Sequence, residues 1–510
     1  MIFKNRSRLS VLVLVFISLA ASSYAFALSA DLTRDYFSAE DMPDKLHKGT
    51  KQFTIEASQM PWHYNDNLSE DIWAYNNTLP GQELRVRKGD RVQVTLVNDL
   101  DVPTTLHFHG MPLENDMDGV PGLTQDPVMP GETFVYDFIA EASGTYWYHS
   151  HQDGAEQVGK GLYGALIVEE FLKSKHDIDY TVMIAEKNSM NLNEHHDGHG
   201  EHDDHGDMNV EGHDTHGMMD EDHHGDSSDD HHMDHDMYDT LILNGKAAPD
   251  IKGVKVKEGD SVRLRFVNTG MFTQTVSIPG HSYKITHYDG QAVHKPTELE
   301  DVSFRIAPAE RYDIEIEMSN PGAWGIQVKA EKMPEELVTY LPIVYEGSDL
   351  LPLNKAEASP HIFDFTSYGK AKNKGIKKID QSLDMTFNEK DDGTFTINGK
   401  QAPHQEKYVV NEGDNVKVTI DNQTAKEHPM HLHGHFFYVV SKNGQSLSGS
   451  PVLKDTLNVA PGDTYEIVFQ ANNPGQWQFH CHELHHSAQG MVSGLHYQGF
   501  EADTYDGHDH

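Results

Sequence analysis

Four pairs of histidines, each separated by one residue, are the part of this sequence whose types and spacing could bind metal ions. Because alternate side chains of a strand point to the same face, each pair would present two imidazoles in one direction. Neutral imidazole is a good copper ligand, and eight nitrogen donors suit three copper ions that keep open coordination positions. The pairs are His107-Phe108-His109, His149-Ser150-His151, His431-Leu432-His433 and His480-Cys481-His482. If the first and last parts of the chain pack together, all eight imidazoles converge in one cluster.

The only cysteine of the chain, Cys481, lies inside the last of these pairs and can form no internal disulfide. A solitary cysteine is usually a small buried hydrophobe. Here the two-residue period of a strand points its side chain away from His480 and His482. A metal bound by the thiolate would therefore lie on one side of the strand and the cluster on the other. The few covalent bonds between them are a natural path for electrons.

The remaining ligands for a metal at this cysteine can be found nearby. His428 precedes the third pair, while His486 and Met491 follow Cys481. Two histidines, one thiolate and a weak axial methionine form a blue-copper electron-transfer site. We therefore predict a fourth copper ion on the opposite face of the strand from the cluster of three.

A competing motif overlaps this region. Residues 482–486 read His-Glu-Leu-His-His and match the H-E-x-x-H pattern of zinc peptidases, whose chemistry needs a helix. Residues 476–481 directly before it indicate a strand, and a peptidase would leave the other three pairs unexplained. His281, His287 and His294 lack the paired spacing, and we expect them to be structural or exposed.

Short alternating strands must position these ligands. The chain has 510 residues, which exceeds the size of a single hydrophobic core and predicts two to four domains. Three segments share a strand, a Gly-Asp turn and an alternating strand that ends in Asn, a grammar typical of β-sandwiches. They are VRKGDRVQVTLVN from Val86, VKEGDSVRLRFVN from Val256 and VNEGDNVKVTIDN from Val410. We predict an all-β protein with three homologous domains at residues 45–172, 178–350 and 360–502.

Residues 191–239 interrupt this pattern. They contain 12 histidines and 5 methionines among many acidic residues, with no lysine or arginine. Such a composition cannot form a packed core, so we predict a disordered insertion in the middle domain. Imidazole, thioether and carboxylate together suit copper, and we expect the insertion to bind extra copper ions weakly. The alternative is a solvated loop of biased composition.

Charge and the first residues bear on location and partners. The chain has 40 basic and 80 acidic residues, for a formal net charge of −40. This balance disfavours nucleic acid and anionic membranes and favours cationic partners, although it also serves solubility. Residues 1–27 resemble an export signal, with a basic start, an apolar run and a small-residue cleavage site. We expect an exported protein, periplasmic or secreted, with no membrane span in the mature chain.

The metal-binding segments resemble those of the multicopper oxidase family, which includes laccases, bacterial cuprous oxidases and periplasmic copper-resistance oxidases. Four segments carry the resemblance in the family's order: HFHG, TYWYHSH, HPMHLHGH and HCHELHHSAQGM. It implies three cupredoxin-like Greek-key sandwiches and four copper ions. It also implies a type 2 copper at His107 and His431, a type 3 pair at His109, His149, His151, His433, His480 and His482, and a type 1 copper at His428, Cys481, His486 and the axial Met491.

The resemblance further implies a reaction. Single electrons from a reducing substrate enter at the type 1 copper, pass along His480-Cys481-His482, and reduce dioxygen to water at the three-copper cluster. Asp118 in DMDGVPG resembles the family's acidic residue near the type 2 copper, and we predict that it relays protons. The alternative is a simple Asp-Gly turn. Ser487 stands where many bacterial relatives carry a glutamate, and Glu427 and Glu483 are nearby carboxylates without an assigned role.

Two electron donors fit this scheme. The His/Met-rich insertion, the acidic composition and the export signal favour oxidation of cuprous ion in copper tolerance, whereas HPMHLHGHFF and DTLNVAPGDT are similar to laccases that oxidise phenols. A copper-storage protein without turnover would suit the insertion alone, but storage needs no electron relay. A copper nitrite reductase would have fewer His-X-His pairs and a shorter chain.

Overall fold

The computed structural model describes residues 49–170, 176–188, 238–331, 336–349, 352–355, 359–372 and 378–501. The predicted export signal and nearly all of the 191–239 insertion lie outside these residues. Strands dominate the described chain, which confirms the all-β prediction. The strands form six sheets in three consecutive pairs, one pair after another along the sequence. No helix within the described ranges is long and apolar enough to cross a membrane.

The first pair of sheets, which we call the first domain, has the strand orders β2-β1-β4-β6 and β3-β8-β7-β5. Two short helical segments, η2 and α2, interrupt it. Its elements are β1 (Thr50–Asn65), β2 (Leu68–Tyr75), β3 (Gly81–Arg87), β4 (Arg91–Asn98), β5 (His107–His109), η2 (Asn115–Met117), β6 (Thr133–Ile139), β7 (Gly144–His149), α2 (Gly154–Lys160) and β8 (Tyr163–Glu169).

The second pair forms the middle domain, with the orders β10-β9-β12-β17-β14-β15 and β11-β19-β18-β13-β16. Its elements are β9 (Ile178–Lys187), β10 (Thr240–Leu243), β11 (Val254–Val256), β12 (Ser261–Asn268), β13 (Gln274–Ser277), β14 (Tyr283–Tyr288), β15 (Gln291–Ala292), β16 (Ser303–Ile306), β17 (Arg311–Glu317), β18 (Ala323–Ala330) and β19 (Leu337–Tyr345).

The third pair forms the third domain, with the orders β21-β20-β23-β29-β25-β26, where β27 also pairs with β25, and β22-β31-β30-β24-β28. Its elements are β20 (Gln381–Glu389), β21 (Phe395–Ile397), β22 (Glu406–Val410), β23 (Asn415–Asn422), β24 (His428–Leu432), β25 (Phe437–Lys442), β26 (Gln445–Ser446), β27 (Val452–Lys454), β28 (Thr456–Val459), β29 (Thr464–Gln470), β30 (Gln476–Cys481), α3 (Leu484–Ala488) and β31 (Val492–Tyr497).

The repeated sequence segment has one structure in all three domains. Its turn glycines, Gly89, Gly259 and Gly413, have φ values of 87°, 88° and 87°, a left-handed conformation that glycine adopts without a steric penalty. The strand that follows ends in a buried asparagine at residues 98, 268 and 422. Each asparagine amide donates to the carbonyl oxygen four residues later and to a carbonyl of a second segment. The asparagine therefore ties the strand end to a second segment of the chain in each domain.

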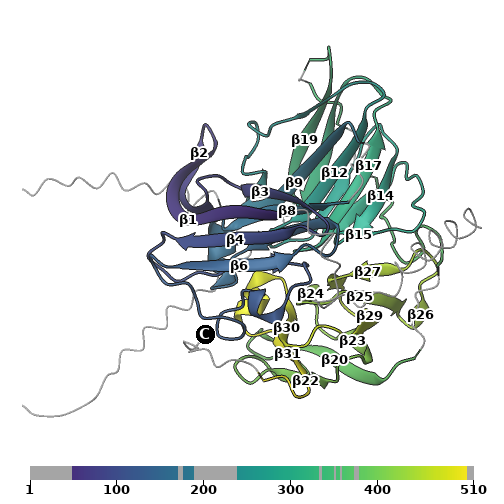
Figure 1. Cartoon of the computed structure of the whole chain (residues 1–510). Helices are drawn as coiled ribbons and strands as arrows, with labels where there is room; N and C mark the ends of the chain where they lie inside the picture. Colours follow the sequence, from purple (N-terminus) through teal and green to yellow (C-terminus); the bar gives the residue numbers. More distant parts are fainter. Residues whose placement is uncertain are drawn as a thin grey trace, which may run out of the picture.

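The domains pack so that the first one contacts both others. Figure 1 shows the first domain (purple to blue) beside the middle domain (teal), with the third domain (green to yellow) below both. An apolar cluster that includes Tyr64, Trp147, Met183 and Ile242 joins the first domain to the middle one. A second cluster runs through the middle and third domains. These contacts place β5 and β7 of the first domain opposite β24 and β30 of the third.

Candidate copper sites

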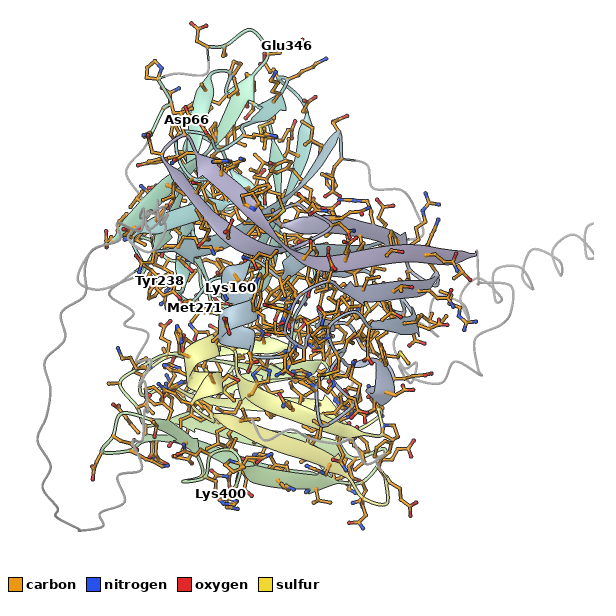
Figure 2. All side chains as sticks on the ribbon, turned by 90° about the vertical axis from the view of Figure 1, so that its left-hand side faces the viewer. Asp66, Lys160, Tyr238, Met271, Glu346 and Lys400 are labelled. Atoms are coloured by element: carbon orange, nitrogen blue, oxygen red, sulfur yellow. The ribbon has the colours of Figure 1, made fainter. Side chains whose placement is uncertain are left out.

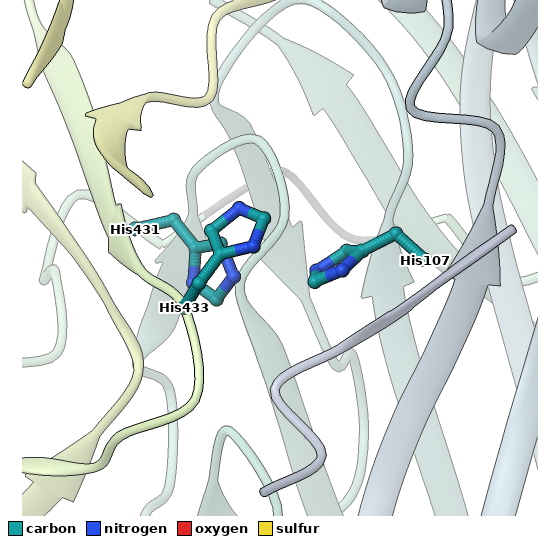
Figure 3. A group of neighbouring side chains, drawn as sticks. All are labelled: His107, His431 and His433. Carbon is teal, nitrogen blue, oxygen red and sulfur yellow. The ribbon is translucent and has the colours of Figure 1, made fainter. Parts of the chain in front are cut away.

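The eight paired histidines meet between the first and third domains. In the first domain β5 pairs with β7 so that His107 lies opposite His149, and in the third domain β24 pairs with β30 so that His431 lies opposite His480. Each pairing sets two His-X-His pairs side by side. The ring centroids of His109 and His431 are then 3.7 Å apart across the domain boundary. Figure 3 shows His107 from the first domain facing His431 and His433 from the third.

The imidazole nitrogens fall into groups small enough to bind single metal ions. Within each group the ligand atoms lie within 4.8 Å of one another, and the groups include His107 with His431 and His433, His107 with His109 and His149, and His151 with His433 and His480. His482 completes the arrangement, with ring centroids 4.8 Å from His109 and 5.3 Å from His149. The fold thus brings together all eight histidines that the sequence singled out for the cluster.

Hydrogen bonds on the outside of the cluster leave nitrogens pointing inward. His107, His149, His431 and His480 each place Nδ1 2.7–3.0 Å from a backbone carbonyl oxygen, which can only accept a hydrogen bond. The opposite nitrogen, Nε2, therefore carries the lone pair. Buried ring nitrogens with no hydrogen-bond partner among the described residues are His107 Nε2, His109 Nδ1, His149 Nε2, His431 Nε2 and His482 Nε2. Buried, convergent and unpartnered nitrogens of this kind fit copper ions.

Burial keeps these rings neutral, the state in which imidazole binds metal. It disfavours the imidazolium form and lowers the pKa of His480 to about 3. The pKa values of His109, His149, His151, His431, His433 and His482 also lie below the ordinary value for the same main reason. These seven imidazoles are therefore ready to bind metal without first losing protons.

Cys481 lies on the other face of β30, as the strand period predicts. Its Sγ is 3.7 Å from Nδ1 of His428 and 3.6 Å from Nδ1 of His486, and the cysteine is fully buried. His428 Nε2 lies 2.8 Å from the hydroxyl of Thr424, so that its Nδ1 faces the thiol. Met491 is also fully buried, and its carbonyl oxygen accepts the Cys481 N–H at 3.1 Å. One thiolate and two imidazoles are thus grouped on one side of the strand, and His480 and His482 turn to the other.

The peptidase arrangement does not form at residues 482–486. β30 ends at Cys481 and α3 begins only at Leu484, so His482 precedes the helix. His482 turns toward the cluster while His486 turns toward Cys481, and the two histidines serve different groups. Glu483 caps α3 by accepting the backbone N–H groups of His485 and His486, and its carboxylate is 3.3 Å from His486 Nε2.

Asp118 is buried against the cluster, with 1% of its surface exposed. Its carboxylate oxygens lie 2.8 Å from His433 Nδ1 and 3.3 Å from His107 Nδ1. Although burial alone would favour the protonated acid, these two imidazoles hold the pKa of Asp118 below its usual range. The next residue, Gly119, has φ +81°, and a Cβ there would lie 2.1 Å from the Leu106 carbonyl oxygen. The close turn at this glycine is what brings Asp118 to both rings.

Several other predicted residues lie outside the cluster. Glu427 accepts hydrogen bonds from Arg305, Thr273 and Asn458 at the boundary with the middle domain, and Ser487 Oγ is 3.4 Å from His480 Nδ1. In the middle domain His281 is buried, as a structural role predicts, with its Nε2 2.7 Å from the Tyr345 hydroxyl and its Nδ1 3.1 Å from the Pro279 carbonyl.

Sequence reasoning missed a carboxylate and a buried histidine. Asp455 lies at the cluster, 3.2 Å from His109 Nε2, and its neighbour Thr456 is 3.0 Å from the same nitrogen. The only sequence sign of this pair was that it opens the segment DTLNVAPGDT. His435 is also buried, but its two nitrogens contact the Tyr497 hydroxyl and the His433 carbonyl, which is a structural arrangement.

Family models for multicopper oxidases match three parts of the chain, residues 56–172, 210–348 and 377–498. These matches span most of the sequence and include every predicted copper ligand.

Individual relatives agree with the family models. "Multicopper oxidase MmcO" of Mycobacterium tuberculosis is 30% identical, over 83% of this chain and 82% of that protein. "Iron transport multicopper oxidase FET3" of Candida albicans is 28% identical, over 82% of this chain and 72% of that protein. Among solved structures, a multi-copper oxidase from Pseudomonas thermotolerans is 25% identical with a TM-score of 0.65, over 88% of this chain and 99% of that one.

Proposed function

This chain belongs to the multicopper oxidases, and we propose that it oxidises cuprous ion outside the cytoplasm and reduces dioxygen to water. In the proposed reaction four cuprous ions are oxidised for each dioxygen converted to two waters, with uptake of four protons. Copper held by the chain would supply one-electron acceptance and donation between these substrates. The residues that would hold it are the eight clustered histidines, for one type 2 and two type 3 ions, and His428, Cys481, His486 and Met491, for the type 1 ion.

The residues of the chain would hold the copper ions in place, provide a path for electrons between the two copper sites, and pass protons at the cluster. Cys481 and its two flanking histidines give a continuous covalent connection between the opposite faces of β30. The Cys481 thiol, although burial raises its pKa well above the ordinary value, must lose its proton to bind metal. Asp118, in contact with His107 and His433, is suited to hold and pass protons at the cluster.

The choice of cuprous ion as donor rests on where the end of the His/Met-rich segment joins the described fold. Tyr238, the first described residue at the end of the insertion, packs against Phe272 with ring centroids 5.9 Å apart. Tyr238 also packs against the apolar cluster that includes Met271, whose N–H donates to Glu186, and Leu484, which directly follows Glu483. Glu483 in turn contacts His486 Nε2 at 3.3 Å. The predicted metal-binding segment would thus rejoin the described chain near α3, which carries His486, the proposed type 1 ligand.

Figure 2 agrees with this placement, because Tyr238 and Met271 lie together near Lys160, directly above the yellow part of the third domain. The helix of Lys160, α2, packs against α3, which carries His486. Two buried carboxylates and a methionine at the point where a metal-binding segment is attached suit a cationic metal donor better than a neutral phenol. The fungal relative named for iron transport and a Campylobacter jejuni structure named as a metallo-oxidase are consistent with a metal donor.

The test is oxygen uptake by the copper-loaded protein, with cuprous ion and with a simple phenol as alternative donors. We expect faster uptake with cuprous ion. A variant of equal length, with every histidine and methionine of residues 191–239 replaced by serine, should lose part of that rate at low cuprous concentrations and keep its rate with the phenol. The equal length keeps both attachment points intact.

A faster rate with the phenol, unchanged in the serine variant, would instead identify a laccase with a dispensable metal-binding segment. The segments HPMHLHGHFF and DTLNVAPGDT of the third domain, which are similar to laccases, favour this second donor. No uptake with either donor, despite full copper loading, would overturn the oxidase function itself. Export is part of the proposal and is tested separately by fractionating cells that express the full chain.

A further inference from the structure

One ligand of the cluster is turned the opposite way from its neighbours. His107, His149, His431 and His480 hold Nδ1 on the outside and present Nε2 to the interior. His109 holds Nε2 on the outside, and its Nδ1 is the buried nitrogen without a partner among the described residues. Metal binding by His109 through Nδ1 requires the tautomer with the proton on Nε2. The groups that contact Nε2 determine whether this tautomer is favoured.

The groups beyond His109 Nε2 impose that tautomer. Asp455 Oδ1 lies 3.2 Å from the nitrogen, and a carboxylate can only accept a hydrogen bond. Thr456 Oγ1 lies 3.0 Å away and donates its own proton to Asp455 at 2.8 Å, so it too accepts from the ring. Among the described residues no backbone carbonyl does this for His109, in contrast to the four neighbours. The orientation of this one ligand thus depends on a side chain that could itself rotate.

Arg311 of the middle domain prevents that rotation. Both of its terminal nitrogens donate to the Asp455 carboxylate, at 2.6 Å and 2.6 Å, and both residues are fully buried. Its Nε donates to the Thr145 carbonyl oxygen on β7 at 3.0 Å. Although burial opposes charge, Asp455 and Asp289 raise the pKa of Arg311 above its ordinary value. One guanidinium therefore connects a strand of the middle domain, a strand of the first and a carboxylate of the third.

The chain directly after His109 is shaped around this ion pair. Gly110 has φ +78°, and a Cβ at this position would lie 2.3 Å from Asp455 Oδ2 and 2.4 Å from Arg311 Nη2. Any other residue would displace the pair, so the glycine of the HFHG segment has a packing reason as well as a conformational one. The ligand and its support are thus fitted to each other.

We propose that Arg311 is a positioning residue for the three-copper cluster: it holds Asp455 so that Asp455 keeps the proton of His109 on Nε2 and leaves Nδ1 free for copper. The middle domain, which has no copper motif, thereby takes part in building the cluster. The inference rests on the copper-binding role given to His109 under the proposed function. Support groups of this kind typically change metal affinity by about 10–100-fold when removed.

The experiment compares copper retention in the full-length protein and in Arg311→Lys, which keeps the positive charge but loses the two-pronged contact. Copper-loaded, oxidised protein is equilibrated with increasing concentrations of a cupric chelator, and retained copper is measured by elemental analysis. The visible band of thiolate-bound copper reports the Cys481 site separately. We expect the cluster to lose copper at about 10–100-fold lower chelator concentrations while the Cys481 site is unchanged.

Arg265→Lys is the matched control. Arg265 is also a buried middle-domain guanidinium at the boundary with the first domain. It donates two hydrogen bonds to Asp179, at 2.6 and 2.8 Å, and one to Thr145 Oγ1 at 2.7 Å. It contacts none of the predicted copper ligands within the described residues. We expect this variant to lower the unfolding temperature to a similar extent as Arg311→Lys without selective loss of cluster copper.

If Arg311→Lys does not fold, Asp455→Asn provides the same test. The amide oxygen would take the place of Oδ1, which accepts from Arg311 and Thr456, so the amide nitrogen would face Arg311 Nη2, donor against donor. The two-pronged contact is then broken, and cluster copper should again be lost more readily than from the wild-type protein. Unchanged cluster retention in the folded variants, or equal loss in Arg265→Lys, would overturn the proposal. A wild-type protein that binds no copper at the eight histidines would overturn the ligand assignment, an outcome that the measurement distinguishes from either of these.

Discussion

The first domain meets its two neighbours through interfaces of opposite character. Toward the middle domain it offers apolar contacts and complete ion pairs, and the chains approach so closely that a Cβ on Gly144 would lie 2.6 Å from the Cα of Gly290. Toward the third domain it offers imidazoles, several of which have a buried nitrogen without a partner among the described residues. At the first interface, within the described chain, the ion pairs are hydrogen-bonded and Trp147 Nε1 is a single unpartnered polar atom of the joining cluster, whereas the second interface gathers five unpartnered ring nitrogens that metal would occupy.

This difference has an energetic meaning. Each buried polar atom left without a partner costs about 1–3 kcal/mol, so the copper-free interface between the first and third domains carries an unfavourable contribution. At the interface between the first and middle domains, each buried ion pair forms several hydrogen bonds, and these offset the free energy of removing its charges from water. Domains of the same fold thus form one interface that is stable without metal and one whose stability depends on metal.

Removing copper should have the largest effect, and only on one of the two interfaces. A site saturated at 1,000 times its dissociation constant contributes about 4 kcal/mol of stability, which for a chain of this length is roughly 4 °C of unfolding temperature per copper, or roughly 16 °C for four ions. Calorimetry measures the shift. Hydrogen exchange should show faster amide exchange in β5 and β24 with β9 and β17 unchanged. Equal acceleration at both interfaces would mean that the two interfaces do not differ in their dependence on metal.

Asp118→Asn should separate catalysis from support at the metal-dependent interface. The amide keeps the shape of the carboxylate but cannot exchange a proton, so turnover per bound copper should fall by about 10²-fold. Oxygen uptake, normalised to copper content, and its solvent isotope effect are the measurements. Asp313→Asn is the control, because Asp313 is equally buried but bonds Thr145 and Arg265 at the interface between the first and middle domains.

The Asp313 variant should lose stability, by about 3–5 kcal/mol for a broken buried pair, and keep its turnover per copper. If both variants lose turnover equally, Asp118 has no role in proton transfer beyond holding the interface together.

Acid should weaken the two interfaces in a fixed order in the copper-free protein. Burial lowers the pKa of His480 to about 3, far below the unfolded value near 6.5. The unfolded chain therefore binds the proton first as pH falls, and each such histidine removes about 1.4 kcal/mol per pH unit below about 6.5. By contrast, burial alone would raise the pKa of Asp179, but its bonds to Arg265 outweigh this effect, and the pKa is lowered. The stability that the ion pair of Asp179 with Arg265 contributes is therefore present above about pH 4 and is lost only as the pH falls below that value.

Urea unfolding of the copper-free protein between pH 7 and pH 4 measures this slope, with hydrogen exchange to locate it. Bound copper keeps the imidazoles neutral, so the loaded protein should begin to lose stability only at a lower pH. A copper-free protein whose stability is flat from pH 7 to pH 5 would mean that its imidazoles are not held neutral by burial.

The local part of this architecture could be predicted from sequence, and the long-range part could not. The four histidine pairs, Cys481 and the repeated Gly-Asp turn depend on a strand period of two and on local turn geometry, which neighbouring residues determine. The contact of Arg311 with Asp455 joins residues 144 positions apart, and no periodicity links them. The reversed ring of His109 follows from that contact, so it was equally hidden. Three copies of one strand-turn-strand segment indicated the domains, but not which of their faces would carry charge.

The smallest effect on copper binding and activity is expected from a middle-domain histidine whose two ring nitrogens both have hydrogen-bond partners. His281 of the middle domain donates through Nδ1 to the Pro279 carbonyl oxygen and accepts at Nε2 from the Tyr345 hydroxyl, and it is as well buried as a copper ligand. His281→Phe should lower stability by about 1–2 kcal/mol through the lost hydrogen bonds. Copper content and oxygen uptake should stay at the wild-type values, whereas His431→Phe should lose cluster copper. Loss of one copper in His281→Phe would mean that a buried histidine with both nitrogens occupied can still serve a metal, and the distinction between the two interfaces would then not lie in their unpartnered nitrogens.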